Sequence, residues 1–255
     1  MPRSLSINGR VYDEEANPMT AQAQNQRVSP FADFPGDASE VGSSFAKASD
    51  RILRIDLDGS VYGQLGAAIA HTGDIKFRRL SPLHMKGIAG KALLALRPLV
   101  LAEGKGRLYC ARQGWRLRLL KLAGETVNVS AEELLAFEST LDFKLFTIGE
   151  GISVAAGGVF AVKLSGTGSL VIATHGDPMV IPVTAGNDLR TDPHATVAWT
   201  EGLEPKRTVD MNWKSLVGLG GGEVIQMHFS GNGEVVVQPS EDPSKLSLKK
   251  LKKLL

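Results

Sequence analysis

The sequence predicts an all-β protein: three diverged β-rich repeats in a pseudo-threefold, sandwich- or prism-like arrangement, followed by a short C-terminal amphipathic helix. Two observations support this fold class. Short apolar runs bounded by Gly, Asn, Asp and Pro continue from Arg51 almost to Pro239, and many short strands with regular turn signals are typical of sandwiches and barrel-like sheets. A glycine-rich motif also recurs three times, which indicates an internal repeat.

The first 48 residues are predicted to form a flexible N-terminal arm. Prolines are scattered there among Ser, Asn, Gln and Asp, and no period of 2 or 3.6 residues persists. Such a segment has too little apolar surface to form a core of its own. The start of the sequence shows no apolar signal core and carries several acids, so the expected location is cytoplasmic.

The β domain is expected over residues 49–241. Its first strand begins with the alternating run Ile52–Leu57, and the dipeptide Asp58-Gly59 predicts a turn directly after it. The division of this domain follows from two recurring motifs.

The first motif is a pair of glycines separated by one residue and followed by a strand. It occurs at Glu103–Gly106, Ser165–Gly168 and Ser230–Gly233, with spacings of 62 and 65 residues. Glycine adopts positive φ without steric cost, which favours hairpin turns. The predicted turn residues are Gly104, Gly106, Gly166, Gly168, Gly231 and Gly233.

The second motif keeps nearly the same period. Ala70, Ala136 and Ala198 each stand in a short apolar run, and the spacings between them are 66 and 62 residues. The two motifs together predict repeats at about 49–122, 123–184 and 185–241. A single unit would leave an apolar face in water, whereas three units packed around an axis would bury these faces together.

These residues resemble the altered inheritance of mitochondria protein 24 family, and its bacterial branch most closely. The similarity is carried by Ala155–Gly158, Thr174–Pro178, Asp192–Trp199 and Phe229–Glu241, within a match over roughly residues 50–241. It implies repeated β units similar to those of the tryptophan RNA-binding attenuation protein, with no enzyme activity. Mitochondrial relatives are linked to organisation of the inner membrane and its cristae complexes.

No residue pattern predicts catalysis, a metal or a cofactor. The five histidines form neither a His-x-His pair nor a helical zinc pair, and Cys110 is the only cysteine. The motif around Ser165 and Ser230 lacks the Gly-x-Ser-x-Gly order of hydrolases. Glu132, Glu133 and Glu138 are expected to be solvated hairpin acids.

The first repeat is basic. From Lys76 to Lys121 the sequence has twelve Lys or Arg residues and one acid, Glu103. Alternation places Arg116 and Arg118 on one face of a strand, where they could follow a phosphate backbone while an exposed aromatic residue stacks on bases. In the alternative, this face is merely solvated and Trp115 lies in the core. The candidate contacts are Arg107, Arg112, Arg116 and Arg118.

Residues 242–255 predict a basic amphipathic helix, with Asp242-Pro243 as its N-cap and first turn. The helix would dock on an anionic membrane surface or a partner, or pack on the protein's own core or a neighbouring subunit. The candidate contacts are Leu248, Lys249, Leu251, Lys252 and Leu255.

The resulting functional hypothesis is a non-enzymatic scaffold or assembly protein. Its expected partners are another protein or a second copy of itself, and an anionic membrane surface is the further option, at the inner face of the membrane. Nucleic-acid binding through the basic first repeat is the alternative hypothesis. Ligand binding in a cleft between repeats is a third, although no small-molecule substrate is indicated.

Overall fold

The structure is a computed structural model that describes residues 6–7, 10–11, 44–81, 98–148, 159–209 and 225–239. The described part is all-β, which confirms that part of the predicted fold class, and it contains no helix long and apolar enough to cross a membrane. The chain divides into two units, Met1–Gly36 and Asp37–Leu255. In the first unit, the two-residue strands β1 (Ser6–Ile7) and β2 (Arg10–Val11) pair antiparallel.

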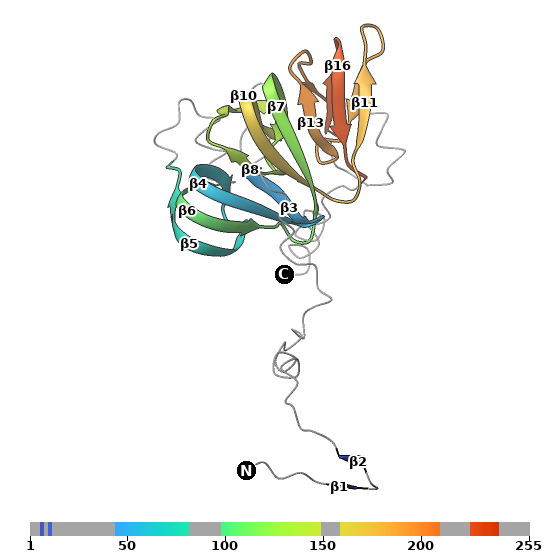
Figure 1. The fold of residues 1–255 in the computed structure, drawn as a ribbon. Coiled ribbons are helices and arrows are strands. Elements are labelled where there is room, and N and C mark those ends of the chain that lie inside the picture. Colours follow the sequence, from blue (N-terminus) through green and yellow to red (C-terminus); the bar gives the residue numbers. More distant parts are fainter. Residues whose placement is uncertain are drawn as a thin grey trace, which may run out of the picture. The chain divides into compact units, whose positions relative to one another are not determined.

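The second unit contains an 11-stranded sheet and a three-stranded sheet, and all of their pairings are antiparallel (Figure 1). The strands of the large sheet are β3 (Phe45–Ser49), β4 (Ile52–Gln64), β5 (Ala68–Arg79), β6 (Leu99–Cys110), β7 (Arg116–Ser130), β8 (Leu134–Glu138), β9 (Asp142–Ile148), β10 (Val159–Thr174), β11 (Met179–Val183), β13 (Thr196–Thr200) and β16 (Gly233–Val237). The small sheet consists of β12 (Leu189–Thr191), β14 (Lys206–Val209) and β15 (Ile225–Phe229).

The large sheet follows the order β11-β16-β13-β7-β10-β8-β4-β6-β5, with β3 added to β4 and β9 added to β10. The β domain therefore starts at β3, slightly before its expected boundary at residue 49, because Phe45 is buried in the core. The predicted flexible arm and the C-terminal helix lie almost wholly outside the described residues, and both stay predictions.

Several predicted turns are wrong, because their glycines lie inside long strands. Gly104 and Gly106 belong to β6, Gly166 and Gly168 to β10, and Asp58-Gly59 lies within β4. The last motif fits its prediction better, since Gly231 lies between β15 and β16 and Gly233 begins β16. Glycine inside a strand permits a bend and a close approach of the neighbouring backbone.

The first repeat shows what these glycines do. Gly104 on β6 is opposite Gly59 on β4, and Gly106 is opposite Gly73 on β5, so the glycines form a line across three strands. A Cβ atom added to Gly106 would overlap the carbonyl oxygen of Thr72. The strands can therefore approach and bend together at this line, and the β4–β6–β5 sheet curls (Figure 1).

The two sequence motifs meet in each of the three predicted repeats. Gly106 lies against Thr72, while a Cβ on Gly168 would meet Glu138 and Leu141, and a Cβ on Gly233 would meet Thr200 and Leu203. Each of these contacts joins the glycine motif to the run that contains the recurring alanine. The buried apolar residues also form three clusters, the first mainly from β4 and β6, the second mainly from β8 and β10, and the third around Trp199, Met227 and Phe229. The rotational relation among the repeats stays a prediction.

Candidate functional site

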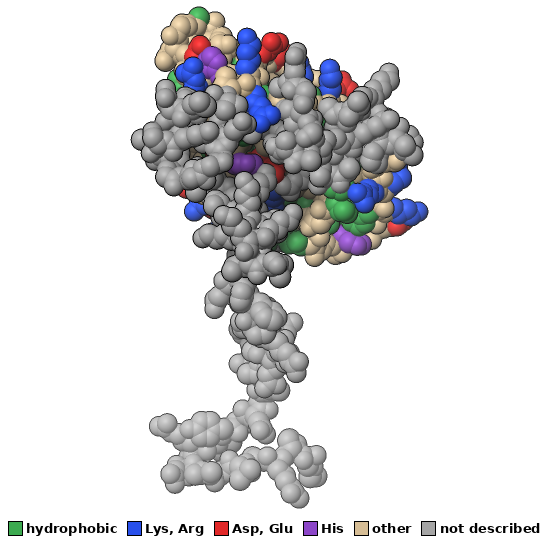
Figure 2. Space-filling model, turned by 180° about the vertical axis from the view of Figure 1, so that it is seen from behind, with side chains coloured by type: hydrophobic (Ala, Val, Ile, Leu, Met, Phe, Trp, Pro, Cys, Tyr) green, Lys and Arg blue, Asp and Glu red, His purple; other side chains and the backbone are tan. Residues whose placement is uncertain are grey.

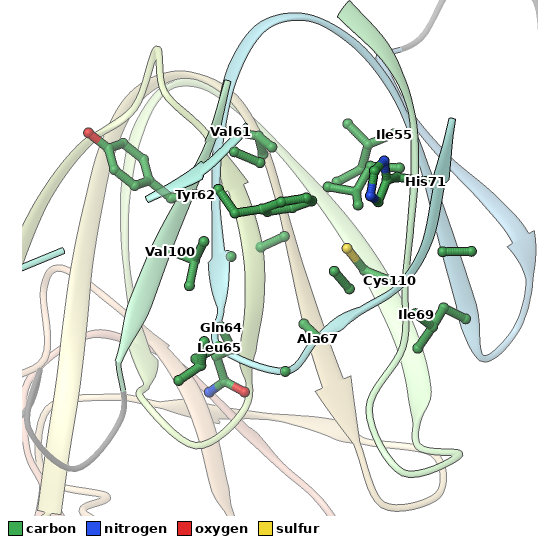
Figure 3. Close-up of a pocket in the computed structure, with 18 of the residues that line it drawn as sticks. Ile55, Val61, Tyr62, Gln64, Leu65, Ala67, Ile69, His71, Val100 and Cys110 are labelled. Carbon is green, nitrogen blue, oxygen red and sulfur yellow. The ribbon is translucent and has the colours of Figure 1, made fainter. Parts of the chain in front are cut away.

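An apolar pocket of about 490 Å³ lies on the concave side of the curled β4–β6–β5 sheet (Figure 3). Figure 3 shows Ile55, Val61 and Cys110 pointing into it, whereas the ring of Tyr62 points away. The walls are formed mainly by aliphatic side chains of β4 and β6, with Ala136 contributed by β8. This volume is within the range of ligand pockets and of the grooves that accept partner side chains.

The pocket is open along β5. Ile69, His71, Phe77 and Arg79 of β5 line the pocket, and of these Ile69 is 55% exposed and Phe77 is 43% exposed. Leu65, in the turn before β5, is also 55% exposed. In the described part of the chain, β5 pairs with β6 and has no strand on its other side. The end of the sheet thus combines an unpaired edge with exposed apolar side chains.

Basic and aromatic side chains surround the mouth of the pocket. The imidazole of His71 meets the ring of Phe77 at a centroid distance of 5.4 Å, and Arg79 extends from the end of the same strand. Figure 2 shows a hydrophobic patch at this end of the molecule, beside a histidine and bordered by basic side chains. The surface is therefore apolar at its centre, with Arg79 and His71 at its rim.

The pocket chemistry gives no indication of a nucleophile. Burial raises the pKa of the Cys110 thiol to about 12, so the thiol stays protonated at neutral pH and is a poor nucleophile. Among the residues that the structure describes, no three His, Cys, Asp or Glu side chains are grouped to hold a metal ion.

The four predicted nucleic-acid contacts are engaged within the protein. Arg116 and Arg118 lie on one face, as predicted, and both bind Asp177, at 3.2 Å and 2.5 Å from its Oδ1. The Nε of Arg107 donates to Asp56 at 2.9 Å. The guanidinium of Arg112 stacks on Trp115, with 4.0 Å between Cζ and the ring centroid.

Trp115 is 9% exposed and belongs to the first apolar cluster, so the alternative that placed it in the core is the correct one. Its ring also lies 3.8 Å, centroid to centroid, from that of His175. Trp115 is thus inaccessible to bases, whereas Phe77 of the same basic segment is 43% exposed. The predicted tail contacts Leu248, Lys249, Leu251, Lys252 and Leu255 lie outside the described residues.

A second group of polar residues is buried where the second and third predicted repeats meet. Glu133 is 2% exposed, so its interpretation as a solvated acid is wrong. Its Oε1 accepts a hydrogen bond from Gln238 at 3.1 Å, and Gln238 also donates to the carbonyl of His194 at 2.9 Å. Burial raises the pKa of the Glu133 carboxyl to about 7, although Ser130, Arg112 and Gln238 partly oppose this shift.

Sequence reasoning missed both Glu133 and the pocket. Glu133 and Gln238 are 105 residues apart, so no local pattern links them. The pocket depends on the curvature of three strands. Its one visible signal was Gly59, Gly73, Gly104 and Gly106 within a single repeat, and these glycines were partly interpreted as turns.

Comparisons with known proteins agree with this architecture. No curated protein matches the chain. A crystal structure of a protein from Streptococcus pyogenes matches with a TM-score of 0.61 and 22% identity, and the match covers 83% of this chain and 98% of that one. At this identity, the likeness shows the fold alone. The family described as mitochondrial biogenesis AIM24 matches residues 45–240, which is well over half of the sequence, and the chain therefore belongs to that family.

Proposed function

We propose that this protein is a non-enzymatic assembly protein that docks a partner at the β5 end of its large sheet. One observation carries the proposal: β5 ends the sheet and leaves its pocket-facing apolar side chains Ile69 and Phe77 in water. Clustered exposed apolar residues typically mark interaction surfaces. An unprotected edge strand is also a template for pairing with another chain.

The interior of the pocket favours a docking role over chemistry. Aliphatic walls and a protonated thiol supply neither an acid–base pair nor a nucleophile. Nucleic-acid binding through the first repeat finds less support, because Arg107, Arg116 and Arg118 already bind acids. Attachment to a membrane through the C-terminal tail stays a prediction.

Site-specific photo-crosslinking in the protein's own cells tests the proposal. A photo-reactive amino acid replaces Ile69 in the full chain, and in a control it replaces Lys121, which is exposed on β7. We expect a crosslinked adduct of defined mass from position 69 and none from position 121. If position 69 gives no adduct above the control, the β5 end is not a docking surface and the proposal fails.

A further inference from the structure

β5 has no neighbouring described strand on its outer side, whereas the equivalent side of the corresponding strand in each of the other two predicted repeats is paired with a strand. β8 is paired on both sides, with β10 and β4, and β13 is paired on both sides, with β16 and β7. β5 carries the same alanine motif as β8 and β13, yet within the described residues it pairs with β6 alone. Among the residues that the structure describes, the first predicted repeat therefore lacks one strand that the other two predicted repeats have.

The second neighbours of β8 and β13 show which properties a strand added to β5 would need. On β4, Val61–Gly63 pair antiparallel with the last three residues of β8, and on β7, Val127–Val129 pair in the same way with β13. Each added segment contributes three uncharged residues. In the second repeat, Tyr62 of the added strand stacks on Phe137 of β8, with 5.1 Å between ring centroids.

The effect of the neighbour is visible in the burial of each strand. The first four residues of β8 and of β13 are all buried, whereas Ile75 is the only buried residue of β5. His71 occupies the position of Phe137, one residue after the recurring alanine, and lines the open pocket. An added strand would place an apolar side chain beside His71 and cover the pocket.

The chain offers one segment with matching properties. β11 is at the opposite end of the same sheet, pairs with β16, and exposes Met179 by 60% and Val180 by 54%. These two residues and the three beside the pocket are all the exposed large hydrophobic residues of the described part. Pro182 lacks an N–H group, so strand pairing at the outer edge would be confined to Met179–Ile181. That length equals the three-residue ladders that β8 and β13 form with their second neighbours.

Charge favours β11 over a second β5 strand as the occupant. β5 carries Lys76, Arg78 and Arg79 against one acid, Asp74, and Arg78 pairs with Glu103. The strand keeps a net positive charge, so two β5 ends placed together would repel each other. β11 has no charged residue. We propose that β11 of a second copy of this chain adds antiparallel to β5, so that copies assemble head to tail. Such a heterologous contact produces closed rings or open filaments rather than simple dimers. This inference rests on the proposed function and names the partner.

Sedimentation velocity of the full chain and two variants tests it. Ile69→Lys blocks the β5 end, and Val180→Lys blocks the β11 end, and both residues are more than half exposed, so both variants should fold. We expect the wild type to form species larger than a dimer. Each variant alone should be monomeric, with association weakened about 100-fold or more, as for loss of a central contact.

The mixture of the two variants gives the decisive result. Ile69→Lys retains an intact β11 and Val180→Lys retains an intact β5, so the equimolar mixture should form one heterodimer and nothing larger. Lys121→Glu is the control and should assemble like the wild type. Phe77→Lys and Met179→Lys form a second pair that should repeat the pattern.

Three results would overturn the inference. A wild type that is monomeric at all concentrations excludes self-assembly. If Val180→Lys assembles like the wild type while Ile69→Lys does not, β5 pairs with itself. If the crosslinked adduct from position 69 contains a different protein, the docking function stands and the second copy is the wrong partner.

Discussion

β5 and β8 carry the same sequence motif but have different surroundings. Both lie against a glycine of their own repeat, Gly106 for β5 and Gly168 for β8. β8 lies between two strands and is buried, while β5 has one neighbour among the described strands and is exposed at nearly every residue. The difference teaches that the motif forms the strand, whereas the neighbouring strand determines whether its inner side chains are buried or available to a partner.

The largest expected effect comes from truncating the equivalent side chains of these two strands. Phe137 is fully buried and contacts Tyr62 and Phe143, so Phe137→Ala should lower the free energy of unfolding by about 3–5 kcal/mol. The exposed His71 has no such packing, and His71→Ala should change the free energy of unfolding by about 0.5 kcal/mol or less. Urea unfolding at low protein concentration measures both. Equal losses would show that β5 is as well packed as β8.

The next largest difference is expected between alanine substitutions at two glycines of the recurring motif, Gly106 and Gly233. Alanine at position 106 would overlap backbone of β5, which cannot move without breaking strand pairing, and we expect Gly106→Ala to cost about 3 kcal/mol. Alanine at position 233 meets side chains of Thr200 and Leu203, which can shift, so its cost should be about half as large. Thermal or urea unfolding compares the two. A smaller loss for Gly106→Ala would contradict the close approach of β5 and β6.

The buried Glu133 should also make the stability of the fold depend on pH. Folding raises the pKa of Glu133 from 4.5 to about 7, so between these values the folded chain holds a proton that the unfolded chain releases. Stability should therefore fall as pH rises through this window, by up to about 3 kcal/mol. Arg112, Glu132, His194 and Gln238 surround this group.

Urea unfolding between pH 4.5 and 8 measures this dependence. Glu133→Gln keeps the shape of the side chain and removes its titration, so the variant should lose most of the slope. If the wild type and Glu133→Gln show the same pH dependence, Glu133 does not carry the effect.

The smallest effect is expected at the arginines of the first repeat. Arg116 and Arg118 share Asp177 on a surface where all three side chains are 40% or more exposed. Exposed ion pairs contribute little, so Arg116→Ala should change the free energy of unfolding by about 0.5 kcal/mol. The difference should shrink further at high salt. If Arg116→Ala lowered the free energy of unfolding as much as Phe137→Ala, the ion pairs on this exposed face would be important for stability, contrary to the prediction.

The sequence allowed the all-β class and the recurring motifs to be predicted, because strand alternation and glycine spacing are local signals. The positions of the turns were predicted poorly. A glycine with positive φ occurs both in hairpin turns and in bent strands. Gly104 and Gly166 have positive φ and lie inside bent strands, not in turns. Local sequence does not reveal whether the chain turns or merely bends.

The candidate site was less predictable than the fold. The motif around Ala70 is similar to that around Ala136, so nothing in the sequence showed that β5 lacks the second neighbour of β8. The burial of Glu133 depends on Gln238 from the end of the last repeat. Both features arise from which strands meet in space, and a single sequence carries no direct record of such pairings.

Hydrogen exchange at the unpaired edge of β5 tests the central claim most directly. The backbone amides of β5 that face away from β6 should exchange rapidly in dilute solution and slow as the protein concentration rises, while those of β8 stay protected throughout. The concentration dependence should vanish in Val180→Lys. Rapid exchange along β5 at every concentration would contradict the account, because it would show that no strand adds to this edge.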